Sequence, residues 1–149
     1  MSELKLRINE SIKAAMRAGE KDRLGTLRLI SAALKQREID ERIELSDAEV
    51  LATLSKMIKQ RRESIGHFEQ AGRTELAAQE YAEIAIISEF LPEPLAEAEL
   101  DRLINQAITE TGATGIRDMG KVMNLLRPQL QGRADPAAVS ARVKERLNA

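Results

Sequence analysis

The stretch that decides the fold class is SDAEVLATLSKMIKQRRESIGHFEQAG, residues 46–72. It opens with the pattern of a capping box, in which Ser46 and Glu49 each satisfy a free backbone amide at the start of a helix. Gly72 supplies a stop signal at the other end. Between them, apolar residues recur every three or four positions, the spacing of one helical face: Val50, Leu54, Met57, Ile58, Ile65 and Phe68. The stretch therefore predicts a long amphipathic helix.

Similar start signals and apolar stripes recur in both directions from this helix. We expect Ser2, Thr74 and Asp118 to cap further helices, and Asp135-Pro136 to begin the last one. No segment shows sustained alternation of apolar and polar residues, so no strand is predicted. The expected helices begin near Ser2, Asp22, Ser46, Thr74, Leu100, Asp118 and Asp135. The sequence thus predicts an all-α protein of seven helices.

Pro92-Glu93-Pro94 is the strongest break in the chain, because two prolines remove backbone donors and force extended geometry. We expect a linker at residues 92–94 between a four-helix domain, residues 1–91, and a small three-helix domain, residues 95–149. Charge changes across this break. Residues 77–101 carry seven acidic and no basic side chains, whereas residues 102–149 carry eight basic and four acidic ones.

The composition excludes several classes of site. The 149 residues include no cysteine and one histidine, His67, so we expect no metal site, no cofactor and no catalytic residue set. A net charge of −1 excludes a globally basic nucleic-acid binder but leaves room for a local patch. Without a signal peptide or a long apolar segment, the chain is expected to be cytoplasmic and not bound to a membrane.

Arg61 lies on the apolar stripe of its helix, between Ile58 and Ile65. A charge in that position needs a partner, since an unpaired buried charge costs several kcal/mol. Glu80 lies on the matching stripe of the next helix, and we expect it to form a structural ion pair with Arg61, with Glu83 as the other possible partner. The alternative is an anion-binding site at Arg61.

A second group of charged residues surrounds Gly120 in the C-terminal part. Glycine in the first turn of a helix costs about 1 kcal/mol relative to alanine, so we expect a close approach there to compensate. One surface could present several phosphate contacts, against the alternative of an ordinary solvated helix pair. The candidate nucleic-acid-binding residues are Arg117, Lys121, Arg127 and Arg133.

With these residues the chain resembles, over essentially its whole length, the free-standing YqeY-like proteins of the GatB/YqeY family. In the N-terminal part the resemblance rests on Lys59–Ser64 (KQRRES), Phe68–Arg73 (FEQAGR), Glu80, Glu83-Ile84 and Phe90–Pro92. In the C-terminal part the resemblance rests on Met119–Met123 (MGKVM), Gly132, Ala134-Asp135, Val143-Lys144 and Leu147. Among these, Gly120, Met123 and Gly132 look structural, and Lys121 is the polar residue that could contact RNA.

The resemblance implies a two-part helical fold, shared with the tail of the B subunit of glutamine-dependent aminoacyl-tRNA amidotransferase. That tail contacts tRNA while other domains perform the chemistry. The catalytic body of that subunit has no counterpart here, so a label of carbon–nitrogen ligase with glutamine as amido-N-donor would describe association rather than activity. We therefore expect a non-catalytic module that binds tRNA or associates with an amidotransferase. The alternative is a protein–protein interaction adaptor without a nucleic-acid role.

Overall fold

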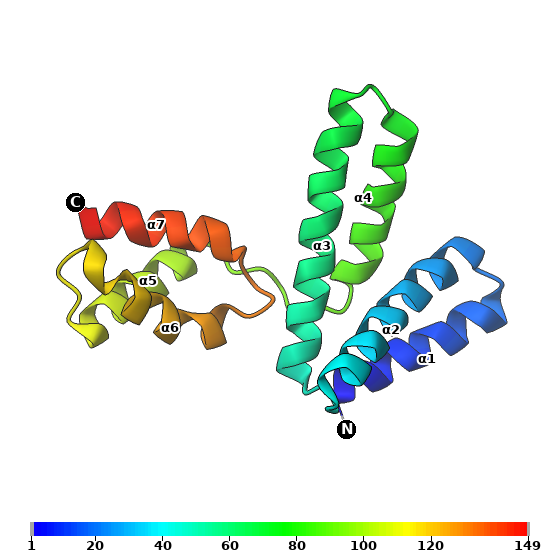
Figure 1. Ribbon diagram of the computed structural model, residues 1–149, viewed down its shortest axis with the longest axis horizontal. Helices are drawn as coiled ribbons and strands as arrows, with labels where there is room; N and C mark the ends of the chain where they lie inside the picture. The colour runs from blue at the N-terminus through cyan, green and yellow to red at the C-terminus, as the bar shows by residue number, and fades with distance from the viewer. Residues whose placement is uncertain (1, 149) are drawn as a thin grey trace. The chain divides into compact units, whose positions relative to one another are not determined.

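The computed structural model describes residues 2–148 and confirms the all-α prediction (Figure 1). Within this range it contains seven α-helices, a short 3-10 helix and no strand. The chain divides into two units, residues 1–91 and residues 92–149. The elements are α1 (Glu3–Ala18), α2 (Lys21–Glu41), α3 (Asp47–Gln70), α4 (Thr74–Ser88), α5 (Glu97–Thr111), the 3-10 helix η1 (Ile116–Asp118), α6 (Met119–Leu130) and α7 (Pro136–Asn148).

The first unit consists of two helical hairpins, α1–α2 and α3–α4 (Figure 1). The apolar stripe of α3 is buried from Val50 to Ile65, as its spacing predicts. The main core of the unit contains no residue of α3 after Ile58, and α4 is the helix that α3 contacts most. That core includes Ile8, Leu27, Ile30, Leu54 and Ile87, all almost fully buried.

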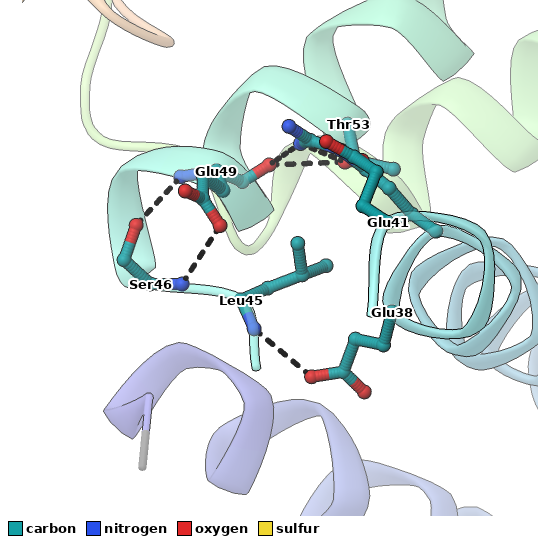
Figure 2. Close-up of polar contacts among 7 residues, drawn as sticks. Glu38, Glu41, Leu45, Ser46, Glu49 and Thr53 are labelled. Carbon is teal, nitrogen blue, oxygen red and sulfur yellow. Dashed lines mark hydrogen bonds and ion pairs between the residues drawn. The ribbon is translucent and has the colours of Figure 1, made fainter. Parts of the chain in front are cut away.

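The connection between α2 and α3 is fixed by polar contacts around the start of α3. Figure 2 shows the predicted capping box: the backbone N–H of Glu49 donates to Ser46 Oγ, and the backbone N–H of Ser46 donates to the Glu49 carboxylate, each at a distance of 3.3 Å. One residue earlier, the Leu45 N–H donates to Glu38 over 3.0 Å. A hydrogen bond from Lys5, together with that N–H, lowers the pKa of Glu38. The turn is therefore held from both sides.

The second unit has its own core. It contains Ile104 from α5, Val122 and Leu126 from α6, and Val139 and Val143 from α7, none of them exposed to solvent. Helix α6 packs against both α5 and α7. Because its inner face is fully used in this way, its outer face determines what the unit presents to a ligand.

Two local expectations need correction. Thr74 is the first residue of α4 rather than its cap, and Arg73 at the cap position makes no side-chain cap bond. Asp118 precedes α6 without capping it, because its carboxylate accepts a hydrogen bond from the Thr114 N–H over 3.0 Å instead. A separate feature of α6 is Pro128, which lies inside the helix.

Candidate nucleic-acid interface

One group of basic side chains in the second unit, Arg142 and Arg146, is neutralised internally. Arg142 contacts Glu97 over 3.0 Å and Asp101 over 3.1 Å, and Arg146 contacts Asp101 over 2.7 Å. These ion pairs join α7 to α5. Their charges are consequently engaged within the fold, and the basic excess of residues 102–149 is smaller at the surface than in the sequence.

The second group lies along η1 and the outer face of α6. Lys121 is 72% exposed, and its only carboxylate neighbour within residues 2–148 is Asp118, at 4.0 Å. Arg117 and Arg127 are also exposed, and within the same range neither has a carboxylate oxygen within 4.0 Å. Arg127 instead donates to the side chain of Asn124 over 3.0 Å. Three of the four predicted cations thus remain available to an anion.

Asp118 limits how positive this surface is. The hydrogen bond from the Thr114 N–H, followed by the charges of Lys121 and Arg117, holds the pKa of Asp118 below its ordinary value. The carboxylate is therefore ionised at neutral pH and attracts the same two cations that a phosphate would use. An anion must compete with it, which favours ligands that offer several phosphates.

Arg133 differs from the other three candidates. It is half-buried in the turn between α6 and α7, and its Nε donates to the backbone carbonyl of Glu93 over 3.1 Å. Part of its guanidinium is therefore already used within the unit. Arg133 is the weakest of the four candidates for contacting nucleic acid.

The three residues expected to be structural have different environments. Met123 is buried in the core, and Gly132 has φ +75°, a conformation that favours glycine. The close approach expected at Gly120 is absent, because no atom within the described chain lies within 4 Å of a Cβ built there. Gly120 is exposed on the same outer surface as Lys121 and Asn124. Sequence analysis missed Asn124, whose signal was its spacing of three from both Lys121 and Arg127.

The ion pair predicted in the first unit involves two carboxylates. Arg61 Nε lies 3.0 Å from Glu83 and 3.9 Å from Glu80, so Glu83 is the nearer partner. Arg61 also donates to the Met57 carbonyl over 3.2 Å. Burial and the adjacent charge of Glu83 raise the pKa of Glu80, against the opposing effect of Arg61. With its guanidinium engaged by these groups, Arg61 holds the α3–α4 hairpin together and offers little to an external anion.

Two further classes of site are absent from the described residues. No group of three or more histidine, aspartate or glutamate side chains in residues 2–148 could hold a metal ion. No helix in that range is both long and apolar enough to cross a bilayer.

Comparison with known proteins gives the chain its relatives. The family model described as "Yqey-like protein" matches residues 5–147. A protein of Pyrenophora tritici-repentis is 30% identical over 146 residues, which cover 96% of this chain and 80% of the relative. One of Lachancea thermotolerans is 36% identical over 106 residues, or 69% of this chain and 57% of the relative. One of Eremothecium gossypii is 35% identical over 94 residues, or 62% and 51%.

The names of these relatives correct one expectation. All three are called "Altered inheritance of mitochondria protein 41, mitochondrial". The expectation that this chain is cytoplasmic is therefore wrong. It rested on the absence of a signal peptide and of a long apolar segment. A long apolar segment indicates a membrane-spanning helix, but its absence does not distinguish one compartment from another.

Proposed function

Because the chain belongs to the YqeY-like protein family, we propose that it is a non-catalytic module that binds tRNA, or associates with an amidotransferase that does. The observation that carries the proposal is the outer surface of η1 and α6. Arg117 and Arg127 are exposed there with no carboxylate oxygen within 4.0 Å among residues 2–148, and Lys121 is exposed with only Asp118 beside it, at 4.0 Å. Arg142 and Arg146 of the same unit are instead paired at 2.7–3.1 Å. The resemblance to the amidotransferase tail supports tRNA as the ligand.

Phosphate groups are the part of RNA that this surface would contact. Residues 92–149 carry eight basic and eight acidic side chains, so the attraction has to be local rather than a property of the whole unit. The three aromatic residues of the protein all precede residue 91, which leaves the second unit without an aromatic ring to stack on a base. Contacts to phosphate position an RNA without reading its sequence. We therefore expect salt-sensitive binding with little discrimination among tRNAs.

The proposal assigns no chemistry to the chain alone. The described residues offer an exposed cationic surface without a metal-binding group beside it, and the sequence resembles only the tail of the amidotransferase B subunit. Any carbon–nitrogen ligase activity would belong to a larger complex in which this chain contributes RNA binding.

Replacing Lys121 with glutamate tests the proposal. Arg102→Glu is a closely matched control, because Arg102 is 68% exposed on α5 and has one weak ion pair, with Glu99 at 3.8 Å. The two variants make the same change in net charge within the same unit. We expect Lys121→Glu to weaken binding to several tRNAs about equally. It should also reduce the slope of log affinity against log salt concentration by about one unit. Arg102→Glu should change the affinity and this slope much less.

The measurement is the dissociation constant of labelled tRNA by fluorescence anisotropy, between about 50 and 200 mM salt. Circular dichroism of each variant checks that folding is intact. Wild-type protein without salt-sensitive binding contradicts the proposal. Equal effects of the two substitutions also contradict it, because they would indicate general electrostatics rather than a defined interface.

A protein partner for the first unit is the second candidate function. Leu76 and Tyr81 on α4 are 38% and 55% exposed, outside the main core of the unit. Both side chains are open to a partner of α3 and α4. A crosslinking pull-down scored for both RNA and protein separates the two functions: an adaptor yields a protein but no RNA, and Tyr81→Glu removes that protein.

A further inference from the structure

The segment that joins the two units is held at both ends by arginines. On the N-terminal side, Arg23 forms a two-pronged pair with the Glu89 carboxylate, with distances of 2.5 Å and 3.0 Å. Arg7 donates to the Glu89 carbonyl over 3.5 Å and lies 5.7 Å above the Phe90 ring, within the range of a cation–π contact. Phe90 itself is buried in the core of the first unit. The chain is therefore fixed to that unit through Phe90.

On the C-terminal side, Arg133 holds the segment to the second unit. Its Nε donates to the Glu93 carbonyl over 3.1 Å, and its own carbonyl accepts a hydrogen bond from the Leu95 N–H, also over 3.1 Å. The Leu95 side chain packs against the core of the second unit. Glu93 and Leu95 thus belong structurally to the turn between α6 and α7, although the sequence analysis placed the linker at residues 92–94.

Two residues, Leu91 and Pro92, remain between the two ends that these arginines hold, Glu89-Phe90 on one side and Glu93 to Leu95 on the other. The Leu91 N–H donates to the Ser88 carbonyl at 3.1 Å, and the Leu91 side chain packs against the core of the first unit, so its ψ angle is the one backbone freedom that it adds to the joint. Pro92 has φ fixed by its ring and confines the preceding residue to extended conformations. Two residues span at most about 7 Å. The available motion is consequently rotation about very few backbone bonds.

We infer that the two units are connected by a joint of two residues, Leu91 and Pro92, whose ends are set by an arginine clamp on each side. Arg7 and Arg23 fix the end at Glu89-Phe90, and Arg133 fixes the end at Glu93 to Leu95. Arg133 is accordingly a positioning residue that limits the length of the joint. Each contact that carries the inference lies within one unit or the other, and none involves the exposed cations Arg117, Lys121 and Arg127.

Amide hydrogen exchange by NMR on the full chain tests the C-terminal clamp. We expect the Leu95 amide to be protected in the wild type and to exchange about fivefold faster in Arg133→Ala, the effect of losing about one net hydrogen bond. Arg127→Ala is the control, since Arg127 contacts the Asn124 side chain and not the joint. A Leu95 amide that is unprotected in the wild type, or that exchanges at the same rate in Arg133→Ala, overturns the inference.

The N-terminal clamp has a separate test that does not depend on the fold of the second unit. Arg23→Ala should accelerate exchange of the Leu91 amide by a similar factor and leave the Leu95 amide unchanged. If both amides respond to either substitution, the segment behaves as one cooperative piece and the two-clamp assignment is wrong.

The freedom of the joint can be tested with spin labels, because the protein contains no native cysteine that would also react with them. Spin labels on Lys13→Cys in α1 and Arg102→Cys in α5 would report the distribution of distances between the units by pulsed electron resonance. Both side chains are more than 60% exposed. We expect Arg133→Ala to broaden that distribution and Arg127→Ala to leave it unchanged. A wild-type distribution as broad as that of Arg133→Ala overturns the inference.

Discussion

Glu80 and Glu83 lie on one side of α4 and compete for a single guanidinium. Glu83 has the hydrogen bond to Arg61, at 3.0 Å, whereas Glu80 remains at 3.9 Å. The two carboxylates should therefore respond oppositely to neutralisation. Glu83→Gln removes a charged hydrogen bond and should lower the free energy of unfolding by about 1.5–3 kcal/mol. Glu80→Gln removes a repulsion and should raise it by about 0.2–1 kcal/mol, measured by urea denaturation at pH 7.

The pH dependence of the Glu80→Gln effect follows from its raised pKa. A carboxyl group whose pKa is higher in the folded protein than in the unfolded chain stabilises the fold while it is protonated, and this contribution is lost as the pH rises through the folded value. Wild type and Glu80→Gln should therefore have similar stability below about pH 4, where glutamate is largely protonated in both states. The advantage of the variant should appear only above that pH. An advantage that is constant with pH contradicts the assigned cause.

Gly66 and Gly72 occupy the same hairpin but have different reasons to be glycine. Gly66 lies inside α3, and a Cβ there meets no atom within 4 Å. Gly72 has φ +72° in the turn to α4, a conformation that other residues rarely adopt. Gly66→Ala should therefore stabilise the protein by about 0.5–1 kcal/mol, and Gly72→Ala should destabilise it by about 1–2 kcal/mol. Thermal denaturation of the two variants beside the wild type provides the measurement, and a loss of stability in Gly66→Ala contradicts the first expectation.

At the scale of elements, the start of α3 rests on local chemistry that can be tested alone. Ser46 accepts a hydrogen bond from the Glu49 N–H at a surface position. Ser46→Ala should lower the free energy of unfolding by about 1 kcal/mol, and Ser46→Asp should retain most of the stability because aspartate also caps helices. Chemical denaturation of both variants measures this. Equal losses in the two variants would show that the hydroxyl acts through something other than capping.

Local cap signals predicted some helix starts and misplaced those at Thr74 and Asp118. Ser2 and Ser46 occupy the predicted cap positions, because each acts on backbone groups within a few residues. The 3-10 helix η1 and the continuation of α6 past Pro128 were not predictable. The continuation of α6 depends on packing against other helices, since Leu126 and Leu130 on either side of the proline are buried in the core.

The candidate site shows the same division between local and tertiary information. The exposure of Lys121 follows from the apolar stripe of α6, which leaves position 121 on the outer face. The sequence could not show that Arg133 would bind the Glu93 carbonyl, because 40 residues separate the two partners. Nor could it show that Glu83 would be nearer than Glu80 to Arg61, since both lie within reach of the same helix face.

At the scale of the whole molecule, the chain has two separate cores. The core of the first unit contains residues from Leu4 to Phe90, and that of the second contains residues from Leu100 to Leu147. Each unit also carries ion pairs of its own, Arg23–Glu89 in one and Arg142–Asp101 in the other. We therefore propose that residues 1–91 and residues 92–149 are domains that fold independently.

Expression of the two fragments tests this last prediction. Each should unfold cooperatively, with enthalpies of about 60 kcal/mol for residues 1–91 and about 40 kcal/mol for residues 92–149 at about 0.7 kcal/mol per residue near 60 °C. The smaller fragment should be the less stable, because a short chain buries a smaller fraction of its surface. Calorimetry of the full chain should give an enthalpy near the sum, and the NMR spectra of the fragments should overlay its spectrum away from Leu91. A second fragment that is unfolded alone, yet folded in the full chain, would mean that its ten-residue core cannot sustain the fold and that the units are not separable.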